Sequence, residues 1–279
     1  MKNVYLYSAI ILAGLVSVVG AFYFLPSNSF SVWSLPAAIV EILNDEKSPA
    51  TPAAQEFTYF EVLDGCNFAY EGDCINVRSG PGTEFPIVAH LRTGVVLSVA
   101  DTVTKDGREW YKVGFAHPLL YPERIVGDWY VAAEFVHAFT DDGDHRLKAG
   151  EVASTKKRII VDVSEQKLYA YDGDVLFMEE LISTGLEFTP TPRGTFQIFK
   201  MTPSRFMQGP IPGVSDQVYD LPGVPWDLYF TDGGAVIHGA YWHEHFGQLW
   251  SHGCVNLPVA KAKELYLWAD IGMPVTVQN

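Results

Sequence analysis

Positive charge is scarce in this sequence. Its 19 lysine and arginine residues stand against 33 aspartate and glutamate residues, which gives a formal net charge of −14. Such a chain has no positive field to collect phosphates, so nucleic acids and other polyanions are excluded as preferred partners. Charged residues make up only 19% of the chain, against 48% hydrophobic residues. The sequence is therefore not a disordered polymer, and its length allows one large domain or two modest ones.

Helical patterns are also scarce in the C-terminal part of the chain. Only residues 259–269 have helical character there, and Gly272 and Pro274 end the pattern. The 24 glycines and 17 prolines favour turns and short strands. We therefore predict a mainly β fold with one or two short helices.

The first segment is a long hydrophobic run. Residues 4–25 carry no charge, and as a helix they would span roughly 33 Å, enough to cross a hydrocarbon core of about 30 Å. A cleaved signal peptide is the alternative, but its apolar run is usually only about 7–15 residues long. We predict an uncleaved signal anchor at residues 1–29 and a linker at residues 30–56. The protein would then be a single-pass protein of the cell membrane with its domains on the extracytoplasmic side.

The chain has three cysteines, and outside the membrane two of them are expected to pair. Cys66 and Cys74 flank a turn at Gly72-Asp73, so we predict a local disulfide between them. Cys254 is then left over, either as a small buried hydrophobe or as a reactive thiol.

Residues 57–140 combine alternating apolar residues with turn signals. Val95, Leu97 and Val99 have the spacing of a half-buried strand, and Asp106-Gly107 marks a hairpin. The segments NVRSGPG, DG-x-x-WYKV and GDWYV resemble the bacterial SH3-like domain. The resemblance implies a small β-barrel that binds a cell-wall or peptide ligand, and a spacer without a ligand is the alternative.

A second β-dominated unit is predicted at residues 154–279, and its chemistry is concentrated in residues 235–258. This stretch holds four of the eight histidines together with Cys254. A thiol is a strong nucleophile only as the thiolate, and a neighbouring imidazole can take its proton. His238 ends an apolar strand that would hold its ring, and Gly239 follows it, which allows a backbone carbonyl to orient the second ring nitrogen. Gly253 frees backbone N–H groups to face a developing oxyanion.

The same residues resemble the YkuD-like L,D-transpeptidase catalytic domain. Its two patterns, His-Gly and Ser-His-Gly-Cys-x-Asn, stand here at residues 238–239 and 251–256. The resemblance implies that Cys254 is the nucleophile and His238 the general base and acid, with Gly253 and Cys254 supplying the oxyanion N–H groups. The resemblance also implies that three further residues shape the turn or bind substrate: Ser251, His252 and Asn256. It also implies a tyrosine at the oxyanion hole, for which Tyr219 and Tyr229 are both candidates.

Other residues of this unit have two interpretations each. Arg193 either holds a substrate carboxylate or faces water. Trp226 and Trp242 either stack on a peptide or belong to the core. His243 and His245 are expected in a loop that lines a cleft.

A zinc hydrolase is the chief alternative from another class, because histidines and Cys254 are good zinc ligands. The chain has no Cys-x-x-Cys or His-Glu-x-x-His pattern, and a strand would turn His243 and His245 to opposite faces. A wall-binding module with an inactive catalytic domain is a further alternative.

The resemblance therefore implies a peptidoglycan L,D-transpeptidase that needs no metal or organic cofactor. Cys254 would form a thioester with a donor tetrapeptide stem, and an amine of a second stem would resolve it. With water or a protein amine as the acceptor, the same chemistry gives carboxypeptidase activity or protein attachment to the wall. The expected partners are stem peptides, the membrane and a wall ligand of the SH3-like domain.

Overall fold

The structure is a computed structural model that describes residues 56–115, 119–147 and 155–279. The predicted signal anchor at residues 1–29, and the predicted linker apart from Glu56, lie outside the described residues. Within the described ranges, no helix is long and apolar enough to span a bilayer.

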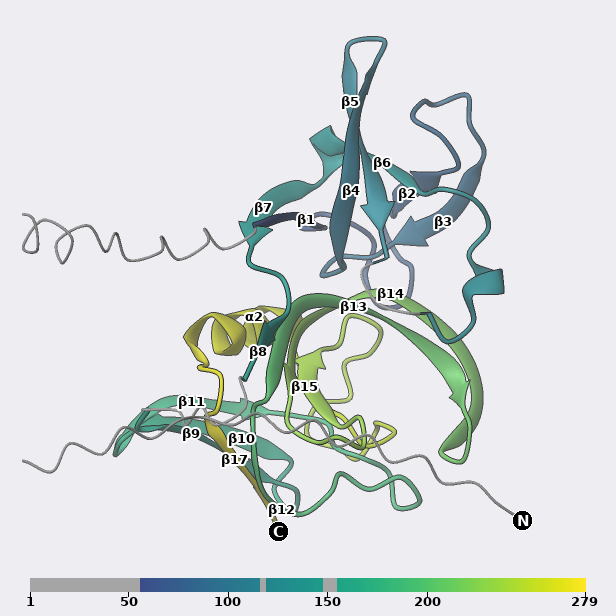
Figure 1. The fold of residues 1–279 in the computed structure, drawn as a ribbon. Coiled ribbons are helices and arrows are strands. Elements are labelled where there is room, and N and C mark those ends of the chain that lie inside the picture. Colours follow the sequence, from purple (N-terminus) through teal and green to yellow (C-terminus); the bar gives the residue numbers. More distant parts are fainter. Residues whose placement is uncertain (1–55, 116–118, 148–154) are drawn as a thin grey trace, which may run out of the picture. The chain divides into compact units, whose positions relative to one another are not determined.

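The first part of the fold is a seven-stranded antiparallel sheet, which we call the N-terminal sheet (Figure 1). Its strand order is β3-β2-β6-β5-β4-β1-β7. The strands are β1 (Phe57–Glu61), β2 (Ile75–Arg78), β3 (Ile87–Leu91), β4 (Val96–Lys105), β5 (Arg108–Gly114), β6 (Tyr130–Ala132) and β7 (His137–Asp141). Two short 3₁₀ helices, η1 (Pro122–Arg124) and η2 (Ala133–Phe135), stand on either side of β6. The relation of the N-terminal sheet to the SH3-like family stays a prediction.

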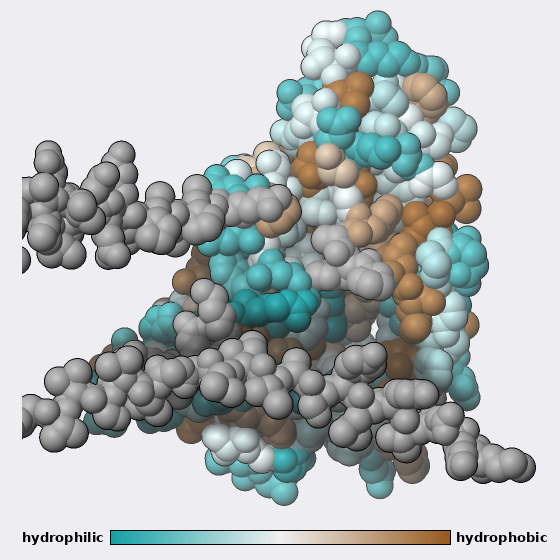
Figure 2. Space-filling model, viewed as in Figure 1, coloured by the Kyte–Doolittle hydropathy of each residue, from teal (hydrophilic) through white to brown (hydrophobic). Residues whose placement is uncertain are grey.

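Local sequence explains the connections of this sheet. Asp106 and Gly107 have φ angles of 52° and 76°, the left-handed pair that a two-residue hairpin turn between β4 and β5 needs. Figure 2 shows mainly hydrophilic residues around the tip of this hairpin, as expected where a sheet faces water. Cys66 and Cys74 form a disulfide, with Cα atoms 4.3 Å apart, which closes the loop between β1 and β2.

Two mixed sheets and a helix make up the C-terminal part. One sheet has the order β11-β10-β9-β17-β12 and the other the order β16-β15-β14-β13-β8. The strands of the first are β9 (Lys157–Asp162), β10 (Lys167–Asp172), β11 (Val175–Leu181), β12 (Gly194–Gln197) and β17 (Pro274–Gln278). Those of the second are β8 (His145–Arg146), β13 (Lys200–Ile211), β14 (Ser215–Tyr229), β15 (Val236–Gly239) and β16 (Val255–Leu257). The helix α2 (Val259–Trp268) begins and ends within one residue of the predicted segment.

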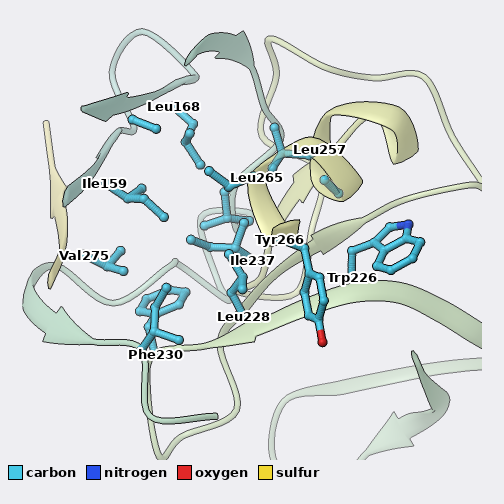
Figure 3. Close-up of a cluster of buried hydrophobic side chains, with 14 of the residues drawn as sticks. Ile159, Leu168, Trp226, Leu228, Phe230, Ile237, Leu257, Leu265, Tyr266 and Val275 are labelled. Carbon is cyan, nitrogen blue, oxygen red and sulfur yellow. The ribbon is translucent and has the colours of Figure 1, made fainter. Parts of the chain in front are cut away.

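A hydrophobic core lies between the two C-terminal sheets and α2 (Figure 3). Ile159 and Leu168 come from the first sheet, Leu228 and Ile237 from the second, and Leu265 from the helix, and each is at most 1% exposed. Burial of this many large aliphatic side chains fixes β14 and β15, the strands that lead to the cavity described below.

The N-terminal sheet shares its core with the C-terminal part. Val96 of β4 belongs to the C-terminal cluster, whereas Val224 and Tyr241 pack with the side chains of the N-terminal sheet. Two polar contacts cross the same boundary: Lys263 pairs with the buried Glu61, and Ser204 Oγ donates to the carbonyl of Val96. The two predicted domains therefore pack as one body over the described residues.

Candidate active site

A cavity of about 750 Å³ contains both Cys254 and His238 in its lining. Its walls come from the long β13–β14 pair, which we call the hairpin, and from the loops around residues 188–192, 233–235 and 250–254. The cavity is thus lined by side chains from two different segments, β15 and the turn just before β16.

Parallel pairing of β15 and β16 positions the backbone around these two residues. His238 pairs with Asn256 in this register, and Cys254 lies just before β16, two residues before Asn256. The register therefore brings β15 next to the turn that carries the thiol, and both residues line the cavity.

His238 is fully buried, and its ring is oriented by its neighbour in sequence. Nδ1 lies 3.0 Å from the carbonyl oxygen of Gly239, which can only accept, so Nδ1 carries the proton. Nε2 has its lone pair free and is buried without a hydrogen-bond partner among the described residues. Burial, with the nearby Arg205 cation, lowers the pKa of His238 to about 3. The ring is thus a neutral base whose Nε2 can accept a proton in the cavity.

Arg205, which the sequence analysis did not single out, contacts the sulfur. Its Nη2 lies 3.7 Å from Cys254 Sγ, and its Nε lies 2.9 Å from Oδ1 of the fully buried Asp227. A guanidinium at this distance attracts a thiolate anion. Cys254 itself is a free, partly exposed thiol, so a substrate can reach it.

The backbone around the sulfur corrects one prediction. The N–H of Gly253 donates to Ser251 Oγ at 3.1 Å, and Ser251 Oγ in turn donates to the Cys254 carbonyl. Gly253 therefore has no free N–H for an oxyanion; instead its φ of 117° allows the turn. The Cys254 N–H has no acceptor among the described residues and remains the available backbone donor.

The two candidate tyrosines lie in different places. Tyr219 lines the cavity and stacks on His252, with ring centroids 6.2 Å apart, and burial together with Cys254 raises its pKa. Its hydroxyl thus stays protonated and able to donate. Tyr229 lies under the Arg205 guanidinium, 5.5 Å from Cζ to the ring centre, and does not line the cavity. His252 also contacts Ser215 Oγ of the hairpin, at 3.2 Å.

Asn256 and His243 form a buried pair beneath the site. The N–H of His245 donates to His243 Nδ1 at 3.1 Å, so Nε2 of His243 carries the ring proton. Asn256 lies 2.8 Å from this Nε2, so we assign its amide oxygen to face the ring, which also gives that buried oxygen a partner. The prediction that His243 lines a cleft is wrong, because its side chain is 4% exposed within this pair.

The expected arrangement of His243 and His245 also needs correction. The segment is not a strand, and the two rings stack with centroids 5.9 Å apart instead of pointing to opposite faces. No group of three or more potential metal ligands is present among the residues that the structure describes.

Two residues predicted to bind substrate lie outside the cavity. Trp226 is 2% exposed and packs between Phe139 and Tyr266, so it is a core residue. Arg193 is exposed and donates to the carbonyl of Thr191 and to Asn279 Oδ1, away from the cavity lining. Trp242 does line the cavity, with its ring 5.7 Å from that of His238.

Comparison with known proteins agrees with this geometry. Residues 156–277 match the family model of the YkuD L,D-transpeptidase catalytic domain. Among solved structures, a serine-for-cysteine mutant of the Enterococcus faecium L,D-transpeptidase is 27% identical, over 45% of this chain and 50% of that one, with a TM-score of 0.40. An L,D-transpeptidase from Mycobacterium smegmatis is 20% identical, over 65% and 98% of the two chains, with a TM-score of 0.43.

The matched part of the E. faecium structure is therefore about half its length. Comparison with curated proteins gives no match. The region that the family model matches includes Cys254, His238 and the hairpin, whereas the N-terminal sheet lies before it.

Proposed function

We propose that this protein is a peptidoglycan L,D-transpeptidase, held at the cell membrane by its N-terminal segment with the catalytic domain outside. One observation carries the proposal: Cys254 and His238 line one cavity, and Nε2 of His238 is buried without a hydrogen-bond partner among the described residues. The family match over residues 156–277 supports the same chemistry.

In the first half of the proposed reaction, His238 Nε2 takes the thiol proton and Cys254 Sγ attacks the carbonyl carbon before the terminal D-alanine of a donor tetrapeptide stem. The carbon–nitrogen bond breaks, and the departing amine takes the proton from His238. A thioester remains. Because the pKa of His238 is lowered to about 3, its cation is unfavourable and passes the proton on readily.

In the second half, an amine of another stem attacks the thioester carbon. Its proton passes to His238 Nε2, the carbon–sulfur bond breaks, and the sulfur leaves as a thiolate next to Arg205. In both halves, the free N–H of Cys254 and the hydroxyl of Tyr219 are the donors available to the oxyanion.

The test is intact-protein mass spectrometry of the full chain mixed with tetrapeptide muropeptides, followed by analysis of the products. We expect an acyl adduct on Cys254 and cross-linked dimers, both absent in Cys254→Ala. Arg193→Ala, outside the cavity, serves as the matched control and should act like the parent protein. Hydrolysed tripeptides without dimers would identify a carboxypeptidase, and a protein-linked product would identify attachment to the wall. Dimers formed by Cys254→Ala would contradict the proposal.

The role of Arg205 is tested with a double variant, because removing Arg205 alone would leave the buried Asp227 carboxylate without its ion-pair partner. We expect Arg205→Met/Asp227→Asn to slow alkylation of Cys254 by iodoacetamide at pH 7 by about tenfold or more. An unchanged alkylation rate in a folded double variant would remove Arg205 from the proposed mechanism.

A further inference from the structure

A second cavity, of about 310 Å³, lies between the N-terminal sheet and the hairpin. It shares Arg92 and Phe206 with the cavity of Cys254, so the two hollows meet at these side chains. Trp129 and Tyr241 give it aromatic walls. A ligand that starts at Cys254 can therefore extend toward the N-terminal sheet.

Arg92 is the unusual residue of this second cavity. It follows β3 and is only 8% exposed. Its guanidinium lies between two tyrosine rings, 4.6 Å from the centre of Tyr70 and 4.8 Å from that of Tyr241. One N–H donates to the carbonyl of Phe68 at 3.2 Å.

This buried cation has no carboxylate within ion-pair distance in residues 56–115, 119–147 and 155–279. The two other arginines near the cavities are compensated: Arg124 lies 3.7 Å from Asp220, and Arg205 lies 2.9 Å from Asp227. Buried charges in proteins are normally paired, because desolvation of an isolated one is costly. The charge of Arg92 is therefore available to an anion that enters the cavity.

We propose that Arg92 binds a carboxylate of the stem peptide whose reacting part occupies the Cys254 cavity, with Trp129 and Phe206 packing against the apolar part of that peptide. This inference rests on the proposed function and adds a substrate-binding residue from the N-terminal sheet. A guanidinium is suited to the task, because it presents parallel N–H donors to a planar carboxylate.

The test measures binding by calorimetry in the full chain carrying Cys254→Ala, which prevents turnover. The probes are a tetrapeptide stem and the same peptide with its carboxylates converted to carboxamides. We expect the carboxylate form to bind about tenfold or more tightly, as one charge-assisted hydrogen bond allows. Adding Arg92→Met should abolish the preference, Arg92→Lys should keep part of it, and the control Arg193→Met, which lies outside both cavities, should retain it.

The outcomes separate this inference from the proposed function. If Arg92→Met weakens binding of both peptides equally, Arg92 only joins the two parts of the molecule and the inference is wrong. Equal binding of both peptides by an enzyme that still makes dimers overturns the inference alone. Absence of binding, together with absence of dimers, overturns the inference and the proposed function together. Amidating only the terminal or only the side-chain carboxylates then identifies which group Arg92 binds.

Discussion

At the scale of single residues, the site depends on buried imidazoles that stay neutral. His238 is held uncharged by burial and can act as a base, whereas His243 is held uncharged beneath Asn256. Burial, with a smaller contribution from His245, lowers the pKa of His243 from 6.5 to about 4. These two rings link folding stability to pH.

The sign of this linkage follows from the depressed pKa of His243. Below about pH 6.5 the unfolded chain binds a proton on His243 that the folded protein does not bind. The contribution of His243 to the free energy of unfolding is therefore complete above this pH and is lost as the pH falls toward 4. Between pH 6 and 4.5 the parent protein should lose about 1.4 kcal/mol more per pH unit than His243→Gln. Urea unfolding at several pH values measures both slopes, and equal slopes would contradict the prediction.

At the residue scale, the sequence offered local signals only. The His-Gly and Ser-His-Gly-Cys patterns singled out Cys254 and His238, and both line one cavity, while their catalytic roles stay a prediction. Arg205 gave no such signal, and the choice between Tyr219 and Tyr229 stayed open, because these positions depend on the register of β13 and β14, which shifts between Arg205 and Met207. The oxyanion role of Gly253 failed because Ser251 Oγ, two residues earlier, takes its N–H.

At the scale of elements, the segment that precedes η1 fastens the hairpin. The backbone of Tyr121 exchanges two hydrogen bonds with the Gln208 side chain, of 2.8 and 3.0 Å. The hydroxyl of Tyr121 donates to the carbonyl of Pro210 at 2.7 Å, and the Arg124 side chain donates to the carbonyl of Gly209. Long-range contacts of this kind leave no periodic pattern in the sequence, so they could not be predicted from it.

Removing this fastening should loosen the hairpin. We expect Gln208→Ala to increase hydrogen exchange in residues 208–220 by about tenfold or more, because three side-chain hydrogen bonds are lost, two to Tyr121 and one to Asp220 Oδ1. The control Gln217→Ala, an exposed hairpin residue whose side chain makes no hydrogen bond among the described residues, should leave exchange near the parent value. Unchanged exchange in Gln208→Ala would show that the hairpin is held by its own strand pairing.

Secondary structure was predictable where alternation and turn residues agreed. The strand around Leu97 and Val99, the turn at Asp106-Gly107 and the helix at residues 259–269 all lie close to the predicted positions. Trp226 was not predictable, because both faces of the central strand β14 are covered and alternation does not reveal which one meets the cavity.

At the scale of the whole molecule, the shared cores predict that the described parts unfold together. Val96 is fully buried and packs in the core of the C-terminal part, although it belongs to the N-terminal sheet. We expect Val96→Ala to cost about 2 kcal/mol. Hydrogen exchange of the β15 and β16 amides should report the same loss of stability in Val96→Ala as exchange of the β4 amides.

The exposed Val126, at 72% exposure, provides the control, and Val126→Ala should change stability by less than about 0.5 kcal/mol. Destabilisation of β4 with no change in β15 would mean that the two parts unfold independently.

The place of Arg92 has a consequence for how peptide selectivity would change under the proposed function. The proposed nucleophile and base belong to the C-terminal part, yet a cation from the turn after β3 lines their cavity. A recombination event that replaced the N-terminal module would keep the reaction and change which peptides are accepted. Chimaeras made at residues 141–155 would therefore inherit their selectivity from one parent and their chemistry from the other.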